Sequence, residues 1–171
     1  LSERPSVATN HTAKAEDVAY IQFSSGSTRF PMGIVVTQRA LMANAAAITA
    51  HGLQVREHDR ATSWLPLYHD MGLVGFFLAA LACQISVDYM ATRDFARRPL
   101  LWLRLISRNR GTLSYSPSFG YELCARRAET ATIDDLDLSS WRAAGIGADM
   151  IRPHVLNRFA EVFAGVGFKP E

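Results

Sequence analysis

Short runs of β-forming residues alternate with helical segments along nearly the whole chain, and this alternation constrains the fold more than any other feature. Strands that are separated by helices pair in parallel, and helices then cover their sheet. We therefore predict an α/β fold with a largely parallel β-sheet flanked by helices. The predicted strands are residues 18–23, 34–36, 61–65, 85–90, 112–115 and 142–146.

The helices between these strands have recognisable starts and ends. Thr37 is expected to cap the first helix, and Gly52 to end it. The segment 71–83 is apolar on every side, which predicts a buried helix, and it is too short for a membrane span of roughly 20 residues. Ser116 and Pro117 are expected to cap and begin another helix. The predicted helices are 38–51, 71–83, 99–111, 116–127 and a last one from residue 153.

The composition narrows the class of protein. Hydrophobic residues make up 49% of the 171 residues and charged residues 20%, which excludes a disordered chain. A formal net charge of +2 is too balanced for a protein that binds nucleic acid through bulk phosphate attraction. Cys83 and Cys124 do not make a disulfide framework, and with no secretory leader or transmembrane segment we expect a cytoplasmic protein. The spacing of the histidines and cysteines predicts no metal site.

The segment between the first two predicted strands is rich in hydroxyl groups and glycine. Residues 24–33 offer hydroxyl donors, backbone N–H groups and the permanent charge of Arg29, which together can hold a polyphosphate. The segment is neither a Walker A loop nor a dinucleotide fingerprint, since it lacks the residues of both motifs. By composition alone, an ordinary loop without a ligand explains it equally well.

The order of residues in this loop resembles the phosphate-binding signature of the adenylate-forming enzymes, [ST]-[SG]-G-[ST]-[ST]-G-x-P-K-G. Arg29 and Met32 depart from the signature, and both departures are usual in one branch, the fatty acyl-AMP ligases. Arg29 supplies a charge that partly offsets the missing lysine. The resemblance implies that ATP and its phosphates bind to Ser24, Ser25, Gly26, Ser27, Thr28, Arg29 and Gly33.

A second signature, SWLPLYHDMGL, spans residues 63–73 and places His69 just after a predicted strand. Ligands collect at this end of a parallel sheet, although a lone histidine there is also explained by a structural hydrogen bond. The stretch resembles the LPLYHDMGL segment of the fatty acyl-AMP ligases. That resemblance implies that His69 is catalytic, near the substrate carboxylate and the α-phosphate. We interpret Asp70 as a helix cap or an orienting residue.

Two later stretches extend the resemblance. Residues 114–127, SYSPSFGYELCARR, resemble the family's xPNFAYELCxRR, and residues 138–152, LSSWRAAGIGADMIR, resemble LDLSSWRxAxxGAEPIR. The implied acyl-binding residues are Tyr68, Met71, Gly72 and Phe119, and the implied adenylate-binding residues are Gly147, Ala148 and Asp149. The arginine pairs 97–98 and 126–127 are expected on solvated helix faces, with an acidic partner surface as the alternative.

The resemblance covers residues 17–171 and implies part of the N-terminal domain of a fatty acyl-AMP ligase, truncated at both ends, with 1–16 as a linker or surface segment. Such an enzyme uses ATP and Mg²⁺ to activate a fatty acid to an acyl-adenylate. It passes the acyl group to the phosphopantetheine arm of an acyl carrier protein in polyketide or lipopeptide synthesis. We expect the piece alone to be inactive. The alternatives are an acyl-CoA synthetase, with coenzyme A as acceptor, a non-catalytic acyl- or nucleotide-binding module, and a generic α/β interaction domain.

Overall fold

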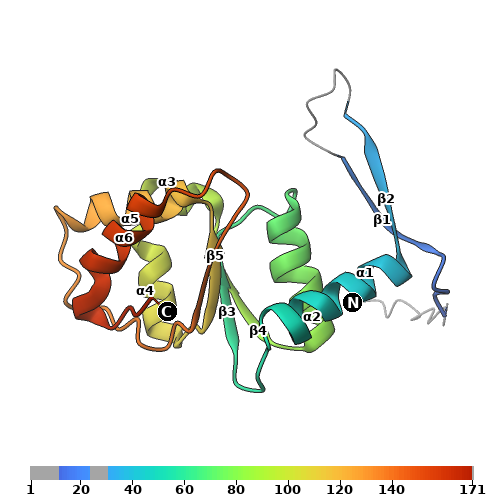
Figure 1. The fold of residues 1–171 in the computed structure, drawn as a ribbon, viewed down its shortest axis with the longest axis horizontal. Helices are drawn as coiled ribbons and strands as arrows, with labels where there is room; N and C mark the ends of the chain where they lie inside the picture. Colours follow the sequence, from blue (N-terminus) through green and yellow to red (C-terminus); the bar gives the residue numbers. More distant parts are fainter. Residues whose placement is uncertain (1–11, 24–30, 171) are drawn as a thin grey trace, which may run out of the picture. The chain divides into compact units, whose positions relative to one another are not determined.

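The computed structural model describes residues 12–23 and 31–170, which belong to two compact units, 1–44 and 45–171 (Figure 1). The first unit contains the hairpin of β1 (Val18–Phe23) and β2 (Gly33–Thr37), an antiparallel pair in which Phe23 lies opposite Gly33. Both strands were expected in the parallel sheet. They pair with each other instead, because the connection between them is too short for a parallel crossover of about a dozen or more residues.

Helix α1 (Gln38–Ala46) follows β2 directly, and the π-helical turn η1 (Ala47–Gly52) continues it. The hydroxyl of Thr37 accepts a hydrogen bond from the Ala40 N–H at 3.2 Å, which confirms the predicted cap. The Asp17 carbonyl accepts the Gln38 N–H at 2.9 Å. Two hydrogen bonds therefore fix the turn from β2 to α1, one to the Thr37 hydroxyl and one to the Asp17 carbonyl.

The second unit is built on a four-stranded parallel sheet with the order β4-β3-β5-β6, which confirms the predicted fold class. The strands are β3 (Arg60–Ser63), β4 (Ser86–Tyr89), β5 (Leu113–Ser116) and β6 (Ala143–Ile146). The chain adds β4 on one side of β3 and then β5 and β6 on the other. The direction in which successive strands are added to the sheet thus reverses between β3 and β5. Such a reversal opens a crevice at the carboxyl ends of these strands.

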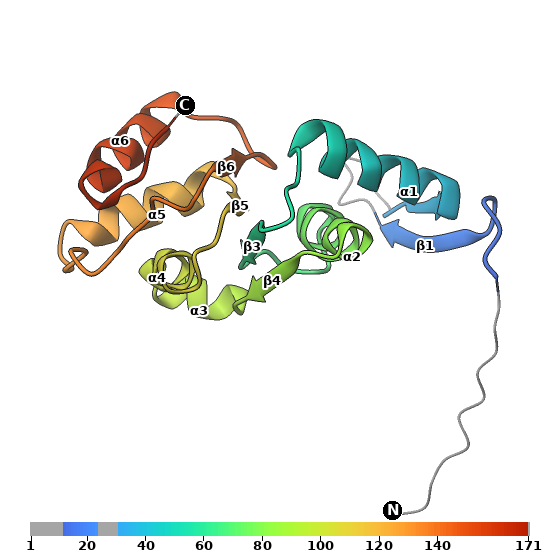
Figure 2. The same ribbon diagram turned by 90° about the horizontal axis from the view of Figure 1, so that it is seen from below.

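Helices cover both faces of this sheet. Figure 2 shows α2 on one side of it and α3, α4 and α5 on the other, with α6 beside α5. The helical segments of this unit, after η1, are η2 (Met71–Leu78), α2 (Ala79–Cys83), α3 (Thr92–Arg97), α4 (Leu100–Asn109), α5 (Ser118–Ala128), α6 (Pro153–Phe163) and η3 (Ala164–Val166). The short helix α3 has no counterpart among the sequence predictions.

An aromatic cluster forms the core between the sheet and α4, α5 and α6. Trp102 and Tyr121 have ring centroids 5.5 Å apart, and Tyr121 and Phe159 are 5.0 Å apart. The Trp102 indole N–H donates to Ser114 Oγ at 2.8 Å, and the Tyr121 hydroxyl donates to the Gly145 carbonyl at 2.7 Å. The Trp102 and Tyr121 rings are thus buried with their N–H and O–H groups hydrogen-bonded, which fixes α4 against β5 and α5 against β6.

Two local predictions are wrong. The helical segment 71–83 is not buried on every side, because Leu81 is 68% exposed while Phe76 packs on the sheet. Ser116 does not cap α5, since its hydroxyl is directed to the Pro117 carbonyl. The first N–H of α5 is bound by a carboxylate from a distant part of the chain, a contact that local sequence does not encode.

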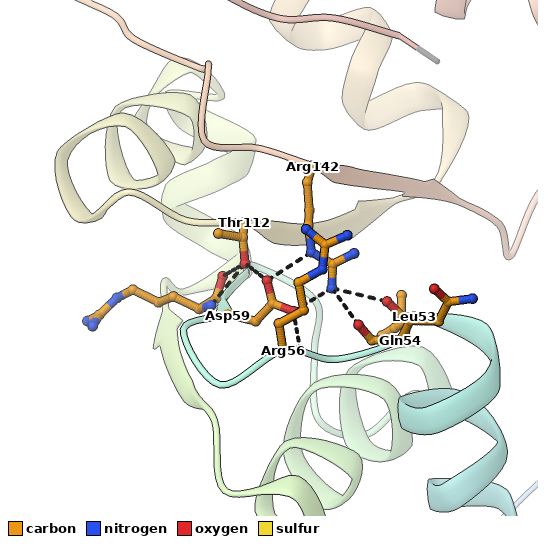
Figure 3. A network of polar contacts seen from close by, with 7 residues as sticks. Leu53, Gln54, Arg56, Asp59, Thr112 and Arg142 are labelled. Carbon is orange, nitrogen blue, oxygen red and sulfur yellow. Dashed lines mark hydrogen bonds and ion pairs between the residues drawn. The ribbon is translucent and has the colours of Figure 1, made fainter.

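The amino-terminal edge of the sheet is joined by a buried polar network (Figure 3). Asp59, Thr112 and Arg142 directly precede β3, β5 and β6. Arg142 donates through Nε to Asp59 Oδ1 at 2.9 Å and through Nη2 to Oδ2, and the Thr112 hydroxyl donates to Oδ1 at 2.7 Å. Burial raises the pKa of Asp59, but hydrogen bonds from Arg142, the Arg56 N–H and Thr112 outweigh it and lower the pKa to about 2.

Candidate functional site

A pocket of about 280 Å³ lies at the carboxyl ends of the strands, where the order of the sheet reverses. Each strand of the sheet contributes to its lining through the residues that follow it. The lining residues are Trp64, Leu65, Pro66, His69 and Met71 after β3, Thr92 after β4, Pro117 and Phe119 after β5, and Ala148 and Asp149 after β6. Three stretches chosen from the sequence as separate signatures therefore meet around one cavity.

His69 lies on the turn between β3 and η2 and is half exposed. Its Nδ1 is 2.7 Å from Asp70 Oδ1, and the same oxygen accepts the Met71 N–H at 2.7 Å. Asp70 therefore both caps η2 and orients the imidazole, as the sequence predicts. The Met71 N–H also approaches His69 Nδ1, at 3.4 Å, so the contacts of the ring lie at Nδ1 and Nε2 is left available to a ligand.

The turn that carries His69 depends on a close backbone approach at Gly72. A Cβ at this position would lie 2.3 Å from the Pro66 carbonyl oxygen, so only glycine fits. The Pro66 carbonyl also accepts the His69 N–H at 3.2 Å. Gly72 does not line the pocket and is positioned to shape the turn, while the predicted acyl contact of Gly72 stays a prediction.

Trp64 forms one wall of the pocket. Its ring stacks on Phe95 with centroids 3.8 Å apart, and its contact with Phe119 is edge-on at 5.7 Å. The Thr92 hydroxyl donates to the Trp64 carbonyl at 2.8 Å, which ties the start of α3 to the end of β3. Phe119 is 43% exposed on the pocket side of this stack, so an apolar ligand can cover it.

The turn after β6 is fastened to the start of α5. Asp149 Oδ1 accepts the Ser118 N–H at 3.0 Å, and the Ser118 hydroxyl donates to the Met150 carbonyl at 2.9 Å. Ala148 has a φ of 63°, a left-handed conformation that few side chains tolerate. Gly147 lies near Met71, since a Cβ there would be 4.0 Å from Met71 Cε.

The structure separates the predicted acyl-binding residues. Met71 and Phe119 line the pocket, whereas Tyr68 is 86% exposed on the turn outside it. The predicted phosphate-binding residues Ser24 to Arg29 lie outside the described residues. Gly33 is described, at the start of β2 in the first unit. The phosphate-binding role of this loop therefore stays a prediction.

Sequence reasoning missed several lining residues. Trp64 and Leu65 stand inside the second signature, but their apolar character made them indistinguishable from core residues. Thr92 was missed because α3 was not expected, although a residue just after a predicted strand was a usable signal. Pro117 was interpreted only as a helix start.

The pocket combines apolar walls with a histidine and a carboxylate at its rim. It can hold an amphipathic ligand with its apolar part against Trp64, Met71 and Phe119 and its polar part near His69. Among the described residues, no cluster of His, Cys, Asp and Glu could hold a metal ion. No helix in the described part of the chain is long and apolar enough to cross a membrane.

Comparison with known sequences identifies a family and several relatives of this chain. Residues 2–169 match the sequence profile of the AMP-binding enzyme family. A Caulobacter vibrioides protein named "Putative acyl-CoA synthetase" is 59% identical over 92% of this chain and 27% of its own length. The medium-chain-fatty-acid–[acyl-carrier-protein] ligase TtuA of Teredinibacter turnerae is 42% identical over 92% of this chain and 24% of its own length. The chain thus spans about a quarter of these relatives.

Solved structures share the fold over nearly the whole chain. A structure from a study of fatty acyl-adenylate ligases of E. coli and L. pneumophila has a TM-score of 0.87 and 54% identity. It matches over 93% of this chain and 29% of its own. The L. pneumophila ligase in complex with acyl adenylate and pyrophosphate has a TM-score of 0.88 and 34% identity, over 93% of this chain and 28% of its own.

Proposed function

The chain belongs to the AMP-binding enzyme family, and on this premise we propose that it forms part of a ligase that activates a fatty acid to its acyl-adenylate. The observation that carries the proposal is the single pocket that gathers His69, Phe119 and Asp149 from three separate stretches. Similarity to acyl-carrier-protein ligases and to a ligase solved with acyl adenylate and pyrophosphate supports it.

In the proposed reaction, a carboxylate oxygen of the fatty acid attacks the α-phosphorus of ATP. The new bond gives the acyl-adenylate, and the bond to the β-phosphate oxygen breaks to release pyrophosphate. Because both reactants are anionic, the protein's tasks are to bring them together and to compensate their charge. Apolar walls at Met71 and Phe119 would hold the acyl chain, which leaves its carboxylate at the rim beside His69.

His69 would act as a hydrogen-bond donor or a positive charge at the reacting oxygens, with its ring orientation fixed by Asp70. Gly147, Ala148 and Asp149 would border the adenylate. Ser24 to Arg29 and Gly33 would bind the β- and γ-phosphates. We propose a Mg²⁺ ion that is carried mainly by the substrate phosphates, as this ion usually is. That ion would supply charge neutralisation.

Exchange of labelled pyrophosphate into ATP, measured with the full-length protein and a fatty acid, tests the proposal. His69→Ala is expected to lower the exchange rate about a hundredfold, since it removes a group that contacts the reacting atoms. His58→Ala is the matched control, because His58 is exposed next to Asp59, at the other edge of the sheet. Equal rates for both variants, or no exchange in the wild type, would refute the assignment.

We further propose that the chain needs the remaining length of its relatives for catalysis, since it covers about a quarter of them. The isolated chain is expected to show no pyrophosphate exchange above background. Exchange by the isolated chain at the rate of the full-length protein would contradict this.

The acceptor of the acyl group defines a second candidate. The Caulobacter relative's name favours transfer to coenzyme A, whereas the Teredinibacter relative's name favours an acyl carrier protein. We propose the carrier protein, because Arg29 and Met32 match the pattern of the fatty acyl-AMP ligases. Supplying each acceptor to the loaded enzyme and measuring the acyl-thioester separates the two, and acyl-CoA as the main product would favour the second candidate.

A further inference from the structure

A cationic groove lies between the carboxyl ends of α3 and α5, outside the site described above. Its volume is about 340 Å³, and three exposed guanidinium-bearing residues line it, Arg97 at the end of α3 and Arg126 and Arg127 in the last turn of α5. The exposed Ala96 and the half-buried Leu123 add apolar surface to its lining. Arginines around an apolar patch are typical of protein–protein interfaces.

The three arginines of the groove have no partner in the part of the chain that the structure describes. Among the described residues, Arg97, Arg126 and Arg127 make no ion pair and no side-chain hydrogen bond. Four other arginines on the same side of the sheet are paired, namely Arg104 with Asp135, Arg110 with Asp137, Arg152 with Glu122 and Arg158 with Glu129. Arg93, Arg98 and Arg108 are unpaired within the described ranges like the groove arginines, but none of them lines the groove. Since Glu129, the one carboxylate in the groove lining, is already bound by Arg158, the groove keeps a positive charge.

Helix stability alone does not explain this arrangement. A cation in the last turn of a helix is favourable, and that accounts for one arginine on each helix. Arg108 satisfies the same condition on α4 and lies outside the groove. The convergence of Arg97 with Arg126 and Arg127 across two helices is therefore a separate feature.

The groove is joined to the pocket by the two helices that form it. Thr92 begins α3 and Phe119 lies in the first turn of α5, and both line the pocket. The last turns of the same helices carry Arg97 and Arg127, which line the groove. From Phe119 to Arg127 the two sites are separated by about 12 Å along α5.

We propose that this groove binds a carboxylate-rich face of a partner protein. The spread of the guanidinium groups over two helices, with apolar surface in the same lining, fits an acidic protein surface better than a small anion, which needs converging donors. Resting on the proposed function, the partner is the carrier protein that receives the acyl group. A partner seated here is one helix length from the pocket, within reach of a flexible prosthetic arm.

Binding of a phosphopantetheinylated acyl carrier protein to the full-length protein tests the proposal, with Arg126→Glu/Arg127→Glu as the variant. The dissociation constant is expected to rise about tenfold or more, because like charges then face each other, and the wild-type affinity is expected to fall with added salt. Acyl transfer to the carrier slows accordingly, while pyrophosphate exchange is unchanged. Arg108→Glu is the matched control and is expected to change binding less than twofold.

The outcomes separate this proposal from the proposed function. Wild-type levels of carrier binding in Arg126→Glu/Arg127→Glu, or an equal loss in Arg108→Glu, would overturn the docking surface. Competition by inorganic phosphate for the same arginines would make the groove a small-anion site and would also overturn it. Restored binding when acidic residues of the carrier are replaced by lysine would support it. Absence of pyrophosphate exchange by the wild-type protein would refute the proposed function. The binding measurement would still test the docking surface.

Discussion

The two edges of the parallel sheet are built in opposite ways. At the amino-terminal edge, Asp59 has a side chain that is 3% exposed, and it accepts hydrogen bonds from Arg142, Thr112 and the Arg56 N–H (Figure 3). At the carboxyl edge, His69 and Phe119 remain substantially exposed around a pocket. The difference indicates that one edge holds the strands together, which leaves side chains at the other edge free to contact a ligand.

The largest expected effect comes from breaking the closed edge. Asp59→Asn removes the buried carboxylate and leaves the partly buried Arg142 guanidinium without its counter-charge. We expect a loss of about 3–5 kcal/mol in the free energy of unfolding. Urea denaturation followed by tryptophan fluorescence measures it. Asp137→Asn removes an exposed pair with Arg110 and is expected to change the free energy of unfolding far less, because water screens an exposed pair. Similar losses in both variants would show that the network is no more important than a surface pair.

Acid should weaken the same edge by a smaller amount. The pKa of Asp59 is lowered to about 2 in the folded chain from an unfolded value of 3.8. A depressed carboxyl pKa stabilises the fold above the unfolded value, and this contribution is lost as the pH falls from about 4 through about 2. The loss is about 2 kcal/mol. Denaturation at a series of pH values measures it, and Asp59→Asn should lose this component of the pH dependence. An unchanged profile in that variant would assign the acid sensitivity to other carboxyls.

A change at the packed base of the open edge should have an intermediate effect. A Cβ at Gly120 would lie 2.0 Å from Ser116 Oγ and 3.0 Å from Trp64 Cζ2. Gly120→Ala is therefore expected to displace the Trp64 wall and to cost about 1–2 kcal/mol, with an altered tryptophan emission. Gly75→Ala, where nothing lies within 4 Å of the new Cβ, is the control and should be neutral or slightly stabilising. Equal stability of both variants would show that the wall is not tightly packed.

The smallest stability effect is expected at the pocket rim. His69→Ala removes a half-exposed side chain whose contact is with its neighbour Asp70. The free energy of unfolding should change by less than about 0.5 kcal/mol, because no buried group loses a partner. Thermal unfolding of the variant measures this, and it complements the large loss of exchange expected for the same variant. A loss of several kcal/mol would mean that His69 supports the fold and would weaken its functional assignment.

Much of the fold could be predicted because it follows from local patterns. The strand runs and the helix periodicity gave the parallel sheet, and Thr37 and Asp70 act as the caps that their positions predict. The antiparallel pairing of β1 with β2 needed the length of the loop as well as its composition. Helix α3 was missed because its start is defined by the bond from Thr92 to the Trp64 carbonyl, a contact with a distant strand.

The site was predictable to the extent that its residues belong to recognisable stretches. His69, Met71, Phe119, Ala148 and Asp149 meet at the pocket, since carboxyl ends of parallel strands share one edge. Periodicity could not show that Trp64 lines a cavity, because an apolar residue at a strand end has the same pattern in a core or in a wall. Nor could it show that Asp149 binds the Ser118 N–H of α5.

The most direct test of the central claim is a crystal structure of the full-length protein with a non-hydrolysable fatty acyl-adenylate analogue. We expect electron density for the acyl chain against Met71 and Phe119, with the group that replaces the phosphate within hydrogen-bond distance of His69. Density for the analogue at a site that shares none of these residues would contradict it.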